Sequence, residues 1–155
     1  MSAEVGNPFL KPYATAFAMP PFADVRLEHY QPAFAVGMAE GEAEIARIAG
    51  QSEAATFANT IDALEAGGET LRRVSAVFFN LSGTDTTPEM QAIEREIVPK
   101  LTGYRMRLYQ NEALWARVDA LMRDKDTLAL SGEQVEVLKR YHRAFVKSGA
   151  RLDAA

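Results

Sequence analysis

Two histidines, His29 and His142, are the residues of this chain best suited to bind a metal ion or to act as a general base. A metal-dependent hydrolase built on a His-Glu-x-x-His helix needs two imidazoles one turn apart, with a glutamate between them to activate water. Neither histidine is followed by glutamate, and at Glu28-His29 the order is reversed. The sequence therefore predicts no metal ligand in this chain.

The surroundings of both histidines favour structural roles. His142 lies on an apolar stripe between Leu138 and Phe145, which favours a hydrogen-bonded core histidine over a catalytic base. His29 lies at the start of an expected helix, which favours packing or capping.

Other groups that could do covalent chemistry or hold a cofactor lack the residues they need. The chain has no cysteine, and the serines of "LSGTD" and "LALSGEQ" have neither a partner base nor a strand-to-helix elbow. Gly67-Gly68 follows a helical pattern, so it does not predict a phosphate-binding loop. We assign no catalytic, cofactor-binding or metal-binding residue.

The composition predicts a folded, water-soluble protein in the cytoplasm. The chain has 155 residues, of which 48% are hydrophobic and 25% charged. A net charge of -4 opposes general attraction to nucleic acid or anionic lipid. No secretory signal or membrane-spanning segment is expected. The basic clusters predict solvated helix faces, because acids or apolar residues flank each one at helical spacing: Arg72-Arg73, Arg105 with Arg107, and Lys139-Arg140 with Arg143.

The chain divides into an N-terminal arm, residues 1–24, and a helical domain, residues 25–155. The arm holds four of the seven prolines, and proline favours extended or turn-like backbone. We expect Phe9, Phe17 and Phe22 to fasten this arm across the domain.

Residues 25–155 repeat apolar side chains at steps of three and four, which indicates helices. The expected starts carry N-capping side chains, and Gly67-Gly68 predict a hairpin or a sharp kink; the caps are Thr56, Thr87, Asn111 and Ser131. Strict alternation of apolar and polar residues, which would indicate a strand, is absent from the sequence. The fold class is therefore all-α, with five to six antiparallel helices.

A second stripe on the first helix, Ala33, Gly37 and Gly41, has small residues at a spacing of four. It favours the close approach of another helix. The alternative is backbone exposed to a bound ligand.

Four ordered stretches resemble one family: "PPFADVRLEHYQPAFAVGM", "TFANTIDALE", "RVSAVFFNLSGTDTTPEMQAIEREIVPKL" and "LKRYHRAFVKSGARL". Together they are similar to the N-terminal region of thimet-oligopeptidase-like zinc metallopeptidases, on the branch of bacterial peptidyl-dipeptidase (dipeptidyl carboxypeptidase) and oligopeptidase A. The resemblance covers residues from about Asn7 to the end of the chain.

The resemblance implies a helical clamshell around a deep channel, with zinc held on a His-Glu-x-x-His helix in the C-terminal portion of the full-length parent. This chain would then be a channel-enclosing N-terminal domain, inactive alone. Its partners would be the C-terminal catalytic lobe and short peptide substrates. An apolar patch that the missing lobe covers would be exposed and could cause self-association. The alternative is a stand-alone helical module that binds a protein or peptide without catalysis.

Overall fold

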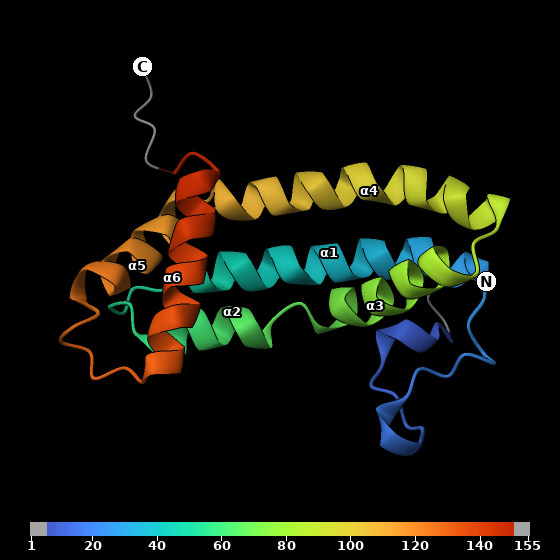
Figure 1. The fold of residues 1–155 in the computed structure, drawn as a ribbon, viewed down its shortest axis with the longest axis horizontal. Coiled ribbons are helices and arrows are strands. Elements are labelled where there is room, and N and C mark those ends of the chain that lie inside the picture. Colours follow the sequence, from blue (N-terminus) through green and yellow to red (C-terminus); the bar gives the residue numbers. More distant parts are fainter. Residues whose placement is uncertain (1–5, 151–155) are drawn as a thin grey trace. The chain divides into compact units, whose positions relative to one another are not determined.

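The computed structural model describes residues 6–150, and within that range the protein is all-α (Figure 1). The predicted fold class is confirmed, since the described residues form helices, turns and loops with no strand. No helix in this range is long and apolar enough to cross a membrane. The α-helices are α1 (Leu27–Ala49), α2 (Ala63–Ala66), α3 (Glu69–Thr84), α4 (Pro88–Tyr109), α5 (Glu112–Asp124) and α6 (Gly132–Lys147). Shorter elements are η1 (Pro8–Leu10), η2 (Ala16–Ala18) and η3 (Phe57–Asp62).

The chain forms two compact units, each with its own hydrophobic core. Among the described residues, the first unit comprises 6–41 and 68–102, and the second comprises 42–67 and 103–150. Helices α1 and α4 each contribute their N-terminal part to the first unit and their C-terminal part to the second.

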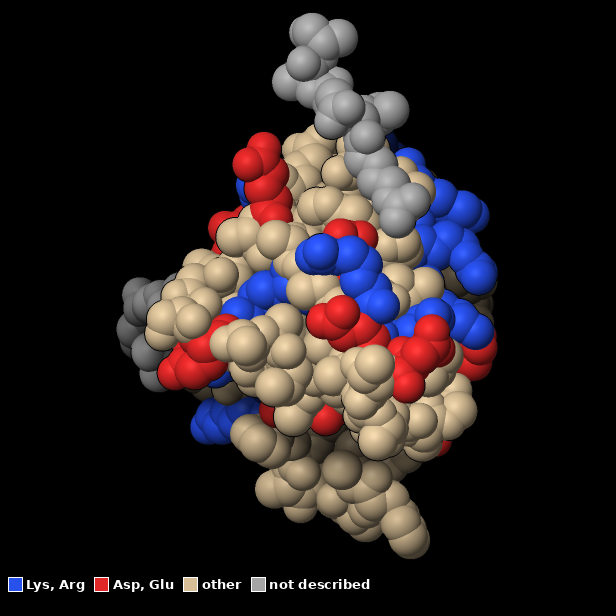
Figure 2. All heavy atoms as spheres, turned by 90° about the vertical axis from the view of Figure 1, so that its left-hand side faces the viewer, with Lys and Arg blue, Asp and Glu red and all other residues tan. Residues whose placement is uncertain are grey.

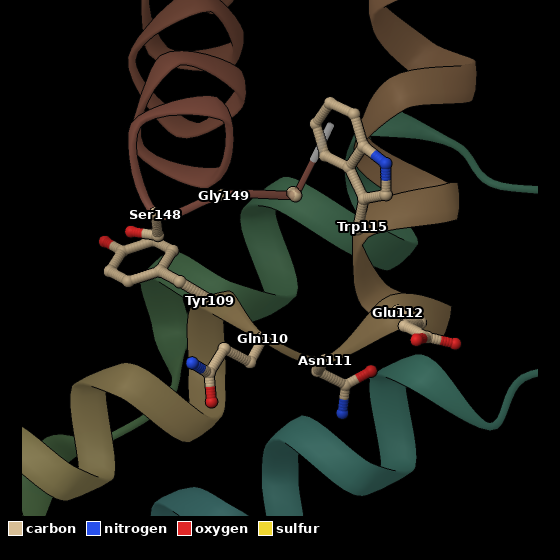
Figure 3. Close-up of a pocket in the computed structure, with 8 residues that line it drawn as sticks. Tyr109, Gln110, Asn111, Glu112, Trp115, Ser148 and Gly149 are labelled. Atoms are coloured by element: carbon tan, nitrogen blue, oxygen red, sulfur yellow. The ribbon is translucent and has the colours of Figure 1, made fainter. Parts of the chain in front are cut away.

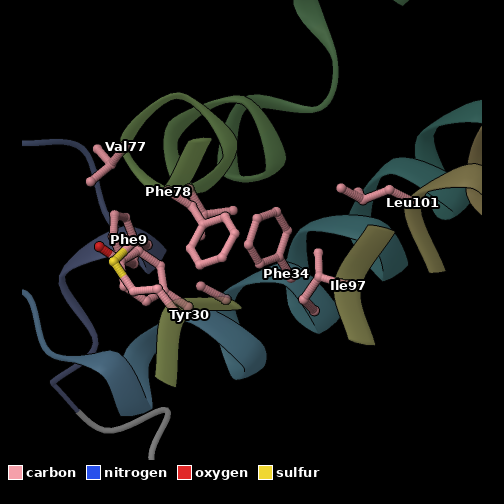
Figure 4. Packing of buried hydrophobic residues seen from close by; sticks show 10 residues of the cluster. Phe9, Tyr30, Phe34, Val77, Phe78, Ile97 and Leu101 are labelled. Carbon is pink, nitrogen blue, oxygen red and sulfur yellow. The ribbon is translucent and has the colours of Figure 1, made fainter. Parts of the chain in front are cut away.

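Interlocking aromatic rings form the centre of the first unit (Figure 4). The ring of Tyr30 lies 5.4 Å from that of Phe9 and 4.9 Å from that of Phe78, and Phe34 lies 5.6 Å from Phe78. Burying one such side chain stabilises a fold by roughly 1.5–3 kcal/mol. The expected close approach occurs at Gly37, where a Cβ atom would lie 2.8 Å from the backbone nitrogen of Leu71 on α3.

The start of the described arm is fastened to the first unit by a small polar network. Asn7 is 1% exposed; its Nδ2 donates to the carbonyl of His29, and its Oδ1 accepts from the backbone nitrogen of Phe9. Arg73 Nε donates to the carbonyl of Phe9. These bonds hold the Phe9 ring, which is fully buried, against the core.

The expectation that Phe17 and Phe22 also fasten the arm is wrong. Phe17 is 99% exposed and Phe22 is 50% exposed, whereas Phe9 is 0% exposed. The polar network around Phe9 has no counterpart at Phe17, whose backbone takes a left-handed turn at φ 58° that points its ring into solvent.

The second unit buries apolar faces of α5 and α6 with the end of α1 and the segment around η3. The ring of Phe145 on α6 lies 5.2 Å from Tyr109 and 5.8 Å from Trp115. Helix α5 carries Leu114 and Val118 into this core, and both are fully buried.

The predicted N-caps are present. Asn111 Oδ1 accepts from the backbone nitrogen of Leu114 at 2.9 Å, and Thr87 Oγ1 accepts from that of Met90 at 3.3 Å. Thr56 and Ser131 each head a capping box, in which the cap and the third helical residue bond each other's backbone.

The helix predicted after Thr56 does not begin as a regular α-helix. Its first six residues, Phe57–Asp62, wind as a π-helix, and regular α-helix begins only at Ala63. The wider turn lets Thr60 face the buried Arg117 while Phe57 and Ile61 remain in the core.

The break predicted at Gly67-Gly68 is present. Gly67 is extended, and Gly68 has φ 68° and ψ 28°, a left-handed conformation that glycine adopts without steric cost. Helix α3 then starts at Glu69.

Candidate functional site

His29 caps the start of α1. Its ring Nδ1 accepts from the backbone nitrogen of Arg26 at 3.1 Å, and its own backbone nitrogen donates to the carbonyl of Arg26 at 3.0 Å. This arrangement agrees with the capping interpretation, because the imidazole satisfies a free donor at a helix start.

His142 is packed into the second unit. Its side chain is 12% exposed, its Nε2 lies 3.3 Å from Asp119 Oδ1, and its ring centroid lies 5.0 Å from that of Trp115. Asp119 also pairs through Oδ2 with Arg123 Nε at 3.3 Å. These contacts fix the imidazole between α5 and α6, as expected of a hydrogen-bonded core histidine.

The described residues do not fit a zinc site. Between residues 6 and 150, no group of three or more histidine, aspartate or glutamate side chains lies close enough together to hold a metal ion. The two histidines belong to different units, and each makes the local contacts described above. We therefore derive no metal-dependent step from residues 6–150.

The basic clusters pair with acids on the surface. Arg140 contacts Glu65 at 2.9 Å, and Lys139 contacts Glu136 at 2.7 Å. Figure 2 shows basic and acidic side chains interspersed on the face it presents. These ion pairs support the solvated helix faces that the sequence predicts.

Arg117 is a buried, charged residue that the sequence analysis did not single out. It is 8% exposed, and its guanidinium spans two segments of the second unit. It donates to Thr60 Oγ1 at 3.2 Å, Asn59 Oδ1 at 2.8 Å and Gln51 Oε1 at 3.2 Å. It also donates to the carbonyls of Gln51 at 3.3 Å and Glu53 at 3.0 Å.

This network ties α5 to the connection between α1 and η3. A signal was available, because Arg117 lies three residues after Leu114 and four before Leu121, on the apolar face of α5. A charge at such a position needs buried partners, which here are neutral acceptors.

A pocket of about 370 Å³ opens in the second unit between the end of α4, the start of α5 and the end of α6 (Figure 3). The carboxyl ends of α4 and α6 and the Glu112 carboxylate meet the amino end of α5 there, so partial charges of both signs line the pocket. Its lining holds no histidine and no pair of nucleophile and base, so it offers a polar recess without catalytic groups; the lining residues are Tyr109, Gln110, Asn111, Glu112, Trp115, Ser148, Gly149 and Ala150.

Fold and contacts together define a helical protein whose described residues show neither a metal cluster nor a catalytic set. No protein-family model matches the chain. Comparison with curated proteins nevertheless connects it to bacterial peptidases, which confirms the resemblance found in the sequence.

The chain is 38% identical over 149 residues to dipeptidyl carboxypeptidase of Escherichia coli (strain K12), a match that covers 96% of this chain and 22% of that relative. Its Salmonella typhimurium counterpart is 34% identical over 146 residues. Oligopeptidase A of Escherichia coli is 27% identical over 142 residues, covering 91% of this chain and 21% of the relative. This chain thus spans about a fifth of the length of the curated relatives it matches.

Proposed function

We propose that this chain is the N-terminal helical domain of a zinc-dependent peptidyl-dipeptidase, that it helps to enclose the substrate channel, and that it does not hydrolyse peptides alone. The observation that carries the proposal is the match over 96% of the chain to a dipeptidyl carboxypeptidase of which it spans 22%. The full-length parent acts in the cytoplasm and removes dipeptides from the free C-terminus of short peptides.

In this proposal, zinc and its ligands belong to the C-terminal catalytic lobe, which is the chain's principal partner. Zinc bound there supplies the Lewis acid and activated water of peptide hydrolysis. The residues described here contribute rigid helical walls, which physically restrict entry to chains narrow enough to thread a channel. The local contacts of His29 and His142 support a structural role for both imidazoles.

A hydrolysis assay tests the absence of catalysis. Purified chain with added zinc is incubated with a tetrapeptide bearing a free C-terminus, and dipeptide release is followed by chromatography. Escherichia coli dipeptidyl carboxypeptidase is the positive control. We expect no dipeptide from this chain. Zinc-dependent release that disappears in a variant carrying both His29→Ala and His142→Ala would refute the proposal.

Exposed apolar residues in the arm also suit the alternative, a stand-alone module that binds a protein or peptide. The reading frame separates the two functions. Continuation of the frame into a His-Glu-x-x-His sequence excludes the stand-alone module, and its termination after Ala155 favours that module.

A further inference from the structure

Residues 14–23, "ATAFAMPPFA", form an uncharged segment in the first unit, which we call the arm loop. Three of its large apolar side chains are exposed: Phe17 at 99%, Met19 at 53% and Phe22 at 50%. Single exposed apolar residues are ordinary, but three within six positions of an uncharged segment mark an interaction surface.

The tip of the arm loop is a closed turn. Thr15 Oγ1 donates to the carbonyl of Met19, and the backbone nitrogen of Ala18 donates to the carbonyl of Thr15 at 3.1 Å. Phe17 and Ala18 both have positive φ, 58° and 51°, which is unfavourable for residues with a Cβ atom. The turn therefore presents the Phe17 ring in a defined direction. Between residues 6 and 150 the ring, 99% exposed, gains no burial that offsets the cost of the turn.

Both ends of the arm loop are held by the first unit. Leu10 and Tyr13 before it, and Val25 after it, pack against the first core. Backbone bonds from Phe22 to Pro20 and from Asp24 to Pro21 order the return of the chain. A preordered apolar projection on a packed base loses little conformational entropy when a partner covers it.

The length of the relatives indicates the occupant. This chain matches 22% of the Escherichia coli dipeptidyl carboxypeptidase, so about four fifths of that relative lie outside the match. Permanent interfaces are more apolar than transient ones, which fits a surface without charged residues. We infer that the arm loop docks onto the remaining polypeptide of the parent peptidase, with Phe17 inserted into an apolar pocket there. This inference rests on the proposed function.

A binding experiment uses the purified 155-residue chain and, as the probe, the part of Escherichia coli dipeptidyl carboxypeptidase outside the matched segment. The Kd is measured by calorimetry for the unchanged chain and for Phe17→Ser, Met19→Ser and Met106→Ser. Met19 and Met106 form a matched pair, because both are 53% exposed and Met106 lies in the second unit.

We expect Phe17→Ser to raise the Kd about thirtyfold or more, as for a buried aromatic anchor, and Met19→Ser to raise it about tenfold. Met106→Ser should stay within about threefold of the unchanged chain. Equal effects of Met19→Ser and Met106→Ser on the Kd, or no effect of Phe17→Ser, would overturn the inference. The proposed function would still stand in that case, because the unchanged chain binds the probe. Absence of binding by the unchanged chain counts against both.

Methionine oxidation gives a second measurement that does not need the probe to fold separately. The chain replaces the matched segment in the Escherichia coli relative, and peroxide oxidation of Met19 and Met106 is compared with that in the chain alone. We expect Met19 to become protected relative to Met106 only in the joined protein. Unchanged Met19 oxidation there overturns the inference, as does protection in the chain alone that grows with its concentration, which would identify a second copy as the occupant.

Discussion

Replacement of Arg117 by alanine should strongly destabilise the second unit. The change removes five hydrogen bonds between 2.8 and 3.3 Å from a side chain in a residue that is 8% exposed. A hydrogen bond to a charged group contributes about 1.5–3 kcal/mol, but such values are not additive within one network. Only the bond to Thr60 Oγ1 is buried, and Asn59 Oδ1 keeps Thr56 and Thr60 as donors. We therefore value the whole network at about two independent bonds, a loss of about 3 kcal/mol.

Urea unfolding followed by the fluorescence of Trp115 measures this loss. Trp115 is the only tryptophan in the sequence and lies in the second unit, so its emission reports that unit. With a urea slope of about 2 kcal/mol per molar, a loss of 3 kcal/mol lowers the midpoint by about 1.5 M. Circular dichroism, recorded in parallel, follows the helices of both units.

Arg143→Ala is the matched control, because Arg143 is exposed on α6 of the same unit. Its effect should stay within about 0.5 kcal/mol. Arg117→Lys keeps the charge but loses the planar fork, so its stability should fall between those of the unchanged chain and Arg117→Ala. Stability of Arg117→Ala within about 1 kcal/mol of the unchanged chain would show that the network adds little, contrary to our reasoning.

Two further predictions concern other sites. Gly37→Ala should destabilise the first unit by about 1–2 kcal/mol in thermal unfolding, because the new Cβ meets backbone of Leu71 at 2.8 Å and this clash exceeds the gain in helix propensity. Gly83→Ala, whose Cβ enters open space, should instead add about 0.5 kcal/mol; a stabilising Gly37→Ala would contradict the close packing. Burial, then the hydrogen bond and charge of Glu65, raise the pKa of Tyr141 well above its ordinary value of 10.0. The unfolded tyrosine therefore ionises first, and the free energy of unfolding should fall as pH rises above about 10. Urea unfolding at pH 9 and 11 should show a smaller fall in Tyr141→Phe, and an equal fall would refute this assignment.

The helix starts could be predicted because their signals are local. Thr56, Asn111 and Ser131 bond to backbone three residues further along the chain, so residue type and spacing suffice to indicate a cap. The glycine pair Gly67-Gly68 likewise marks a break through its own backbone freedom. The π-helical turn was not predictable, because the buried Arg117 that Thr60 meets lies 57 residues further on.

For the candidate site, the order of residues was enough to identify the lack of a His-Glu-x-x-His spacing. It was also enough to identify the likeness to peptidases that the comparisons confirm. The hydrogen-bond partners of the histidines could not be predicted from the sequence. His142 meets Asp119, which is 23 residues away and on another helix, and such pairs form only when the helices pack.

The sequence by itself determined that this protein is helical, where its helices are capped, and which peptidases it resembles, because apolar periodicity and capping act over a few residues. Only the tertiary structure decided that Phe9 is buried while Phe17 projects into solvent, and that Arg117 lies inside the second unit. The three phenylalanines of the arm, Phe9, Phe17 and Phe22, are chemically identical side chains. The Asn7 side chain donates to the His29 carbonyl and Arg73 donates to the Phe9 carbonyl, so residues distant in sequence hold Phe9 in the core while Phe17 stays 99% exposed.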